Sequence, residues 1–331
     1  MRFFEAQRAA RARTARLLIA FALTVALLVV AVNGALALVW WMLGGLALAG
    51  GALPPHFLAV NTGVVLLYVL GGWWLETGRL RDGGAVRLAE AMGARALRPS
   101  GEAAEQRFAN IVDEMAIAAA LPRPVPMVLA RHGGINAFAT GWDPSDAVVA
   151  VSRGALDHLT REELQAVVAH ELSHLGEGDT RLALRLAGMV IGLELIFRLG
   201  QDLLQADEHG RRGLTAAIGL ALLAAGYPGW VAGHALQAAV SRQREYLADA
   251  RAVQWTRSRD GLGGVLRKVL AQRQQGVAPE PAIASPVQHL LLVGTEAGRA
   301  ARWFDPHPPL AERIRRIYGR ALGPLPLASS P

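Results

Sequence analysis

Cysteine is absent from the 331 residues of this chain. That absence excludes a disulfide framework, a zinc ribbon and a thiolate nucleophile, so any metal site must consist of His, Asp and Glu side chains. Charge is scarce as well, because Asp, Glu, Lys and Arg make up only 18% of the residues, against about 25% in a typical soluble domain. Intrinsic disorder and a coiled coil are therefore excluded for the chain as a whole.

The chain carries a net charge of +7, and the surplus of arginine lies at its two ends. Five arginines lie within residues 1–16 and six within residues 296–320, whereas Lys268 is the only lysine. Nucleic-acid-binding domains carry a basic face or stripe, often with interleaved aromatic side chains, and no such stripe occurs here. We therefore expect no nucleic-acid partner.

Hydrophobic residues are abundant, at 52% of the chain, which disfavours an ordinary soluble enzyme. No Lys, Arg, Asp or Glu occurs from Leu17 to Leu75, and a membrane span needs about 20 apolar residues. This run predicts two transmembrane helices, at about 17–39 and 57–75, with tryptophan pairs near their ends. A signal peptide is the alternative for the first helix. The second span directly downstream favours a membrane anchor over residues 1–76.

The arginines before the first span place the N-terminus in the cytoplasm by the positive-inside rule, and two crossings return the chain to that side. A second apolar block, residues 181–240, predicts a helical hairpin with a charged turn at Gln205–Arg212. The first arm of this hairpin contains Arg185, Glu194 and Arg198. Hydropathy therefore leaves open whether the hairpin crosses the bilayer.

Residues 77–180 and 241–331 have the composition of a soluble domain, which the hairpin divides in two. Three short β-type runs, separated by turn residues, predict a small sheet of hairpins; they are Val125–Leu129, Ala137–Thr140 and Ala147–Val151. Helical patterns surround these runs. We therefore predict a mainly α fold with a small β-sheet, an α+β domain attached to a membrane anchor.

A capping box, Thr160 to Glu163, predicts the start of a helix with apolar side chains along one arc. The apolar residues of this arc are Leu164, Val167, Val168, Leu172 and Leu175. Glu171 falls inside the arc, and His170 and His174 lie along its border. A carboxylate that faces the packed side is costly unless a charged partner or a metal lies nearby. The helix therefore indicates a functional site.

The same helix carries the sequence His170-Glu171-Leu172-Ser173-His174, which is an HExxH motif. Imidazoles four residues apart project from one face of a helix and can bind a single Zn²⁺, while the adjacent carboxylate reaches the metal-bound water. The alternative, two surface histidines on a helix, does not explain the carboxylate on the packed side.

A catalytic zinc needs a third protein ligand. In the segment SRQREYLADA, Glu245 and Asp249 lie four residues apart on a predicted helix. This spacing offers one carboxylate for the metal and a second that accepts a hydrogen bond from the other nitrogen of a ligating imidazole. The alternative is an ordinary solvated helix face, with Arg242 and Arg244 as ion-pair partners.

Four motifs together resemble the HtpX-type membrane zinc metalloproteases, relatives of the CAAX prenyl proteases. In chain order they are NAFATG from Asn136, HELSH followed by Gly178-Asp179, SRQREYLADA, and HPPLAERI from His307. The resemblance covers the chain from the predicted anchor to about Tyr318. It implies a zincin-type catalytic domain and one Zn²⁺ per chain.

The resemblance also implies roles for individual residues. His170, His174 and Glu245 would bind the zinc ion, Glu171 would act as general base, and Asp249 would hold a ligating imidazole. Asn136, on an edge strand, would contact the substrate backbone or the developing oxyanion; its alternative is a turn asparagine after two glycines.

For Asp179 and for the segment from His307 we expect structural roles. The resemblance makes Asp179 a structural residue. We expect the segment from His307 to pack against the core and not to take part in catalysis. Pro308-Pro309 starts a predicted helix with Leu310, Ile314 and Ile317 on one face.

The function implied is a membrane-bound zinc endopeptidase that removes misfolded or damaged membrane proteins. The expected location is the bacterial inner membrane, multi-pass, with the catalytic domain facing the cytoplasm; polypeptides and the lipid bilayer are the expected partners. A processing protease of narrow specificity and a zinc-binding membrane scaffold or sensor without turnover are the alternatives. Because His170 and Glu245 must meet at one metal ion, the hairpin between them crosses the membrane twice or not at all.

Overall fold

A computed structural model describes residues 2–44, 52–98, 102–205, 215–275, 292 and 305–327. The chain forms two compact units. One, here called the helical unit, consists of Met1–Gly78 and Leu186–Gln237; the other, the sheet unit, consists of Arg79–Arg185 and Ala238–Pro331. The helices α2, α7 and α8 contribute residues to both units.

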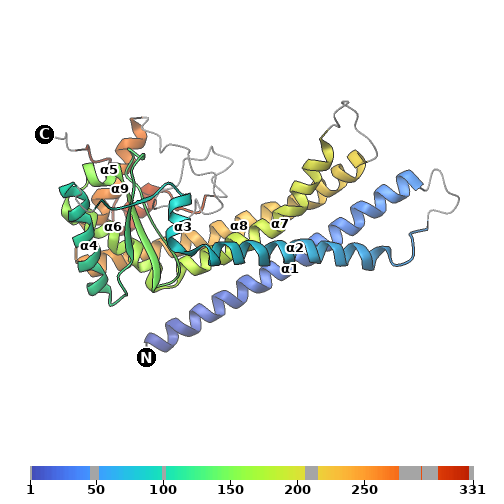
Figure 1. Cartoon of the computed structure of the whole chain (residues 1–331), viewed down its shortest axis with the longest axis horizontal. Coiled ribbons are helices and arrows are strands. Elements are labelled where there is room, and N and C mark those ends of the chain that lie inside the picture. The colour runs from blue at the N-terminus through green and yellow to red at the C-terminus, as the bar shows by residue number, and fades with distance from the viewer. Residues whose placement is uncertain are drawn as a thin grey trace. The chain divides into compact units, whose positions relative to one another are not determined.

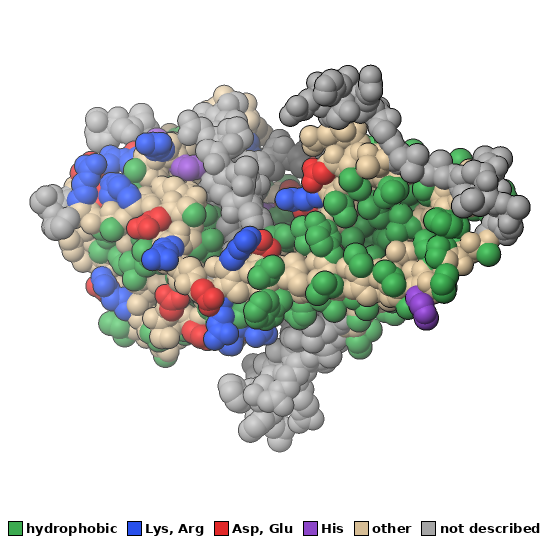
Figure 2. Space-filling model, turned by 45° about the vertical axis from the view of Figure 1, so that its right-hand side comes forward, with side chains coloured by type: hydrophobic (Ala, Val, Ile, Leu, Met, Phe, Trp, Pro, Cys, Tyr) green, Lys and Arg blue, Asp and Glu red, His purple; other side chains and the backbone are tan. Residues whose placement is uncertain are grey.

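The helical unit is built from long apolar helices (Figure 1). They are α1 (Arg2–Gly44), α2 (Phe57–Asp82), α7 (Asp179–Leu204) and α8 (Thr215–Thr256). Among the described residues, Ile19–Met42, Phe57–Arg79 and Thr215–Thr256 are long and apolar enough to cross a membrane. In Figure 2, hydrophobic side chains cover most of the visible surface of this unit. The two predicted N-terminal spans are confirmed as apolar helices.

Glycine brings the helices of this unit close together. A Cβ atom at Gly192 of α7 would lie 2.6 Å from the carbonyl oxygen of Val69 in α2, so the two backbones touch. The same holds at Gly226 of α8, where a Cβ would lie 2.6 Å from the amide nitrogen of Phe197 in α7. Such small-residue contacts are the usual way in which helices associate in lipid. The predicted hairpin is thus α7 and the first part of α8, while its turn at 206–212 lies outside the described residues.

The sheet unit contains four strands in the order β1-β2-β4-β3. Their bounds are Arg95–Ala96 for β1, Val125–Leu129 for β2, Ala137–Asp143 for β3 and Asp146–Ser152 for β4. β3 and β4 form an antiparallel hairpin, but β2 pairs with β4 in parallel. The prediction of a sheet made only of hairpins is therefore wrong. β4 has six consecutive buried residues, as expected of a strand that has a neighbour on each side. β3 lies at one edge of the sheet.

Helices cover both faces of this sheet, in keeping with the alternation of side chains along each strand. On one face, Val148 and Ala150 of β4 pack against α3 (Gly84–Ala91). On the other face, Val149 and Val151 belong to a core to which α8 contributes Ala252 and to which five further helices contribute. These are α4 (Ala103–Ala119), α5 (Arg153–His158), α6 (Arg161–Gly176), α9 (Arg259–Gln274) and α10 (Leu310–Tyr318). The predicted mainly α fold with a small sheet is confirmed.

Candidate metal centre

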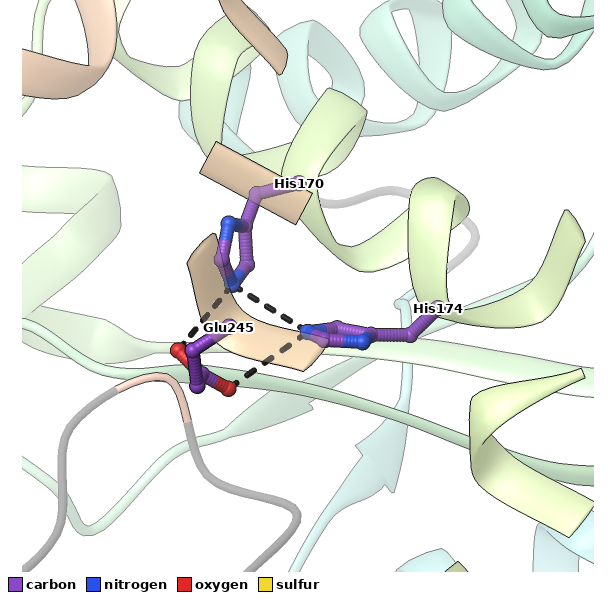
Figure 3. Close-up of side chains that lie close together, drawn as sticks. All are labelled: His170, His174 and Glu245. Atoms are coloured by element: carbon purple, nitrogen blue, oxygen red, sulfur yellow. Dashed lines mark hydrogen bonds and ion pairs between the residues drawn. The ribbon is translucent and has the colours of Figure 1, made fainter. Parts of the chain in front are cut away.

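Three potential ligand side chains converge in the sheet unit: His170 and His174 from α6 and Glu245 from α8 (Figure 3). The Nε2 atoms of the two histidines are 3.3 Å apart. Glu245 Oε2 lies 3.6 Å from His170 Nε2, and Glu245 Oε1 lies 3.5 Å from His174 Nε2. One donor atom from each residue lies within 4.8 Å of the others. The set could hold one metal ion.

Local sequence explains why α6 presents both histidines on one face. Its first turn is fixed by the predicted capping box, in which Thr160 and Glu163 bond reciprocally to each other's backbone nitrogen. Glu163 also accepts a bond from the buried Lys268 of α9, at 2.6 Å. The apolar arc of α6 is buried as predicted. The helix is therefore held at its start by charge and along its length by packing.

Each imidazole has a carboxylate oxygen close to its second nitrogen. Asp249 Oδ1 lies 3.2 Å from His170 Nδ1, and Asp179 Oδ2 lies 3.0 Å from His174 Nδ1. Asp179, taken from the sequence as a structural residue, is itself bonded to Arg244. If both Nδ1 atoms carry the proton that these carboxylates accept, both Nε2 atoms present lone pairs to each other and to Glu245. These acceptor atoms would then converge with no donor hydrogen between them, an arrangement that suits a bound cation.

The pKa values of the two histidines reflect this crowding of acceptor atoms in a buried site. Burial lowers the pKa of His170, which favours the neutral imidazole that a metal requires. Burial also opposes charge on His174, but its bond to Glu245 raises the pKa of that imidazole above the ordinary value. A proton on His174 is one way to relieve the crowding of acceptors, and a metal ion would displace it.

Arg313 of α10 is a residue of this site that the sequence reasoning missed. It is fully buried, and its guanidinium donates to Asp249 at 2.6 and 2.9 Å and lies 3.0 Å from Glu245 Oε2. A single cation thus contacts both carboxylates of α8 and offsets part of their negative charge. The signal was present, because Arg313 lies on the same helical face as Leu310 and Ile314, where an arginine needs a partner.

His307 also reaches the site, although its segment was expected chiefly to pack. The packing prediction is confirmed for α10, where Leu310 and Ile314 are buried. In addition, His307 is buried, and its Nε2 lies 3.9 Å from Glu245 Oε1. Neither ring nitrogen has a hydrogen-bond partner among the described residues. The imidazole of His307 therefore lies between two carboxylates, Glu245 and Asp305, whose Oδ1 is 3.8 Å from His307 Nδ1.

Glu171 lies on α6 between the two histidines and is almost completely buried. Within the described part of the chain, neither carboxylate oxygen has a hydrogen-bond partner. Burial raises the pKa of Glu171 to about 8. A cation at the neighbouring ligands would favour the ionised form. The group is thus suited to exchanging a proton near neutral pH.

Asn136 does not belong to the group of three ligands. It precedes β3, and its side-chain oxygen accepts a bond from the backbone nitrogen of Ala137, at 2.9 Å. β3 is an edge strand, as was expected of the segment that contains Asn136. The backbone nitrogen of Leu292 donates to the carbonyl oxygen of Ala137, at 2.7 Å. The outer edge of β3 therefore accepts a bond from another stretch of backbone.

The HExxH helix, a carboxylate from a second helix and the apolar helices together define a membrane-bound metallopeptidase, which acts on polypeptides. Comparison with known families agrees: the model of peptidase family M48 matches residues 102–321. The chain belongs to this family.

Individual relatives agree with this assignment. A Protease HtpX homolog of Dictyoglomus thermophilum is 37% identical over 211 residues, which cover 63% of this chain and 67% of the relative. One from Ligilactobacillus salivarius is 31% identical over 82% of this chain and 88% of its own length, and one from Kineococcus radiotolerans is 34% identical over 84% and 92%. Among solved structures, S. mikatae Ste24p aligns at 17% identity over 91% of this chain and 66% of its own, with a TM-score of 0.44, too low to support an argument.

Proposed function

We propose that His170, His174 and Glu245 hold one zinc ion per chain. The donor set, two imidazoles and a carboxylate that leave a coordination position open, is the one that zinc takes in catalytic sites. Asp249 and Asp179 keep the Nε2 atoms of the two imidazoles aimed at the ion. Zinc at such a site supplies a Lewis acid that polarises a carbonyl and makes water a nucleophile near pH 7.

In this proposal Glu171 accepts the proton of the attacking water and passes it to the nitrogen of the leaving amine. Its position beside both histidines supports this role, and so does the lack of a hydrogen-bond partner on either carboxylate oxygen among the described residues. Its pKa of about 8 without a cation would fall when one binds, so that Glu171 is ionised when the water attacks. The single observation that carries the proposal is the convergence of three acceptor side chains around one point beside Glu171.

The polypeptide substrate would bind in an extended form along the outer edge of β3, the edge that does not pair with β4. Main-chain pairing of this kind gives affinity with modest sequence preference. The bond from Leu292 to Ala137 supports this mode of binding, because it shows that the outer edge of β3 can accept a hydrogen bond from the backbone of another segment of the chain. Asn136, at the start of β3, would then contact the substrate backbone or the oxyanion.

Misfolded or damaged membrane proteins are the proposed substrates. Low sequence preference suits such a task, and the apolar helices keep the enzyme in the bilayer where these substrates occur. The proposed location is the bacterial inner membrane with the catalytic domain facing the cytoplasm. This orientation is supported by the arginines within residues 1–16, by Arg79 at the end of the second span and by Arg81 just after it.

The hairpin of α7 and α8 would cross the bilayer twice. The part of α7 in the helical unit, residues 186–204, has 19 residues, about 29 Å at 1.5 Å per residue, which is close to the roughly 30 Å of the hydrocarbon core. Close backbone contacts at Gly192 and Gly226 tie α7 to α2 and α8, both of which contain candidate spans. Glu194 and Arg198 in α7 form an ion pair at 3.1 Å, which lowers the cost of their charges in lipid.

Cleavage of β-casein by the purified protein in detergent tests the proposed reaction. We expect Glu171→Gln to lower kcat by at least about a hundredfold, because the proton transfer is lost. Glu162→Gln, an exposed carboxylate on the same helix, is the matched control and should keep full activity. Equal rates for Glu171→Gln and the wild type would refute the mechanism. Bound metal with no turnover in the wild type would instead support the scaffold alternative.

A second assay separates broad quality control from processing. Mass-spectrometric mapping of casein fragments should show many cleavage positions without a common sequence. A single consensus around every cut would favour the narrow-specificity protease.

A further inference from the structure

Two arginines converge on one tryptophan in the sheet unit, and none of the three belongs to the group of metal ligands. The guanidinium carbon of Arg81 lies 5.9 Å from the centre of the Trp142 ring, and that of Arg185 lies 5.5 Å from it. The three residues come from different elements: Arg81 from the end of α2, Arg185 from the first part of α7, and Trp142 from β3. Three segments far apart in sequence thus build one cationic surface on an aromatic base.

These two cations have no acidic partner among the described residues. Arg81 and Arg185 form cation–π contacts but no ion pair, and both are exposed. Asp143, the carboxylate next to Trp142, is instead 3.5 Å from Arg181. Two positive charges above one ring repel each other, and an anion between them would remove that repulsion. The arrangement therefore lacks one component, a negative charge.

The position of the arginines along their helices indicates where this anion comes from. Arg81 lies two residues after the candidate span Phe57–Arg79. Arg185 lies three residues before Gly188, which packs against Thr77 of α2 so closely that no Cβ would fit. Arg81 and Arg185 therefore both lie about one helical turn from the contact between Thr77 and Gly188. That level corresponds to the boundary between hydrocarbon and water, where tryptophan and arginine concentrate.

We propose that Arg81, Arg185 and Trp142 form a binding site for the phosphate group of an anionic phospholipid. Planar guanidinium groups bind phosphate oxygens in pairs, and the Trp142 ring holds the two groups at a fixed spacing. A lipid fits better than a soluble anion because its phosphate lies at this level of the bilayer. The site would anchor the β3–β4 hairpin, which contains the edge strand, at the membrane surface.

Lipid titration of the full chain in a neutral detergent tests the site. Dioleoyl phosphatidylglycerol is added, and bound lipid is counted by native mass spectrometry to give an apparent Kd. The double variant Arg81→Gln/Arg185→Gln should bind this lipid about thirtyfold more weakly, since each arginine near an anionic surface contributes about one kcal/mol. Trp142→Leu, which keeps both charges, should bind several-fold more weakly because the spacing is lost.

The matched control is Arg123→Gln/Arg161→Gln, which removes two exposed arginines of the same unit. We expect it to bind phosphatidylglycerol like the wild type, and dioleoyl phosphatidylcholine to bind all variants equally. Melting temperatures in the same detergent show that each variant is folded.

Three results would overturn the proposal. They are unchanged binding by Arg81→Gln/Arg185→Gln, an equal loss in the control variant, and full displacement of the lipid by millimolar inorganic phosphate. The last result would identify a site for soluble anions. None of these outcomes depends on whether the protein cleaves peptides, so the lipid site can fail while the proposed reaction stands.

Discussion

At the scale of single residues, the candidate site combines several hydrogen-bond acceptors with one buried cation, Arg313. Arg313 contacts both Asp249 and Glu245 and is completely buried. Without it, two carboxylates one helical turn apart would face each other in a protein interior. A buried carboxylate that loses its partner costs much more than an exposed one.

We expect Arg313→Met to lower the free energy of unfolding by about 3 to 5 kcal/mol, the usual cost of breaking a buried ion pair. Thermal unfolding in detergent, followed by circular dichroism, measures it. Arg315→Met, on the same helix but in an exposed pair with Glu312, should cost less than about 1 kcal/mol. Equal melting temperatures for the two variants would show that Arg313 does not hold the carboxylates.

A second residue-scale prediction concerns pH. The guanidinium of Arg95 and the backbone nitrogen of Arg98 bond to the buried Glu105, and they hold its pKa below the ordinary value of 4.5. A carboxyl with a depressed pKa stabilises the fold above its unfolded-state pKa, and this contribution is lost as the pH falls through the folded-state pKa. Glu105→Gln should therefore be less stable than the wild type by a constant amount between pH 7 and pH 5.

Below pH 4.5 the difference between Glu105→Gln and the wild type should shrink, because the wild-type carboxyl becomes protonated. Asp113→Asn, in an exposed pair with Arg123, is the control and should differ little from the wild type throughout. A stability difference for Glu105→Gln that stays constant down to pH 3 would contradict the assignment.

At the scale of elements, glycine decides how the apolar helices of the helical unit meet. A side chain at Gly192 would meet the carbonyl oxygen of Val69 at 2.6 Å and the backbone of Trp73 at 3.3 Å. At Gly71 of α2, in contrast, a Cβ meets nothing within 4 Å. The two positions therefore allow a direct comparison of the same substitution.

We expect Gly192→Ala to destabilise the protein by about 1 to 3 kcal/mol, the usual cost of overpacking. Gly71→Ala should be neutral or slightly stabilising, because alanine favours a helix more than glycine does. Melting temperatures of both variants in one detergent measure the difference. If Gly71→Ala were the more damaging of the two, the contact between α2 and α7 would be wrong.

The elements themselves were predictable to different degrees. Periodicity and the capping box located α6 and its buried face, and the absence of charge located α1 and α2. The parallel pairing of β2 with β4 was not predictable, because pairing depends on which edges the rest of the chain covers and not on local alternation. β1, with two residues, is too short for a pattern.

The same contrast applies to the candidate site. HExxH and the four-residue spacing of Glu245 and Asp249 are local patterns on single helices, and they were visible in the sequence. Arg313 and His307 come from the C-terminal segment, and their contacts with Glu245 arise from tertiary packing of α10. The helical spacing of Arg313 from Leu310 could have marked it as a buried arginine, but no local pattern shows which carboxylates it meets.

At the scale of the whole molecule, the bilayer is the main constraint on the proposed function. The chain contains no cysteine, so a single introduced cysteine reports its own accessibility. Gln205, exposed at the end of α7, should lie outside the cytoplasm if the hairpin crosses twice. Arg257, after α8, should lie inside.

In intact cells, a membrane-impermeant maleimide should therefore label Gln205→Cys but not Arg257→Cys. Both variants should react after the cells are lysed, which controls for burial. Labelling of neither cysteine in intact cells would place the hairpin on the cytoplasmic side and exclude a double crossing.

The central claim is that His170, His174 and Glu245 hold one catalytic zinc ion, and the metal content of the purified protein tests it most directly. Inductively coupled plasma mass spectrometry should find about one zinc per chain in the wild type and in the control Glu162→Gln. We predict that Glu245→Ala retains less than about a tenth of that zinc while keeping a folded circular dichroism spectrum. Unchanged zinc in folded Glu245→Ala protein would contradict the account.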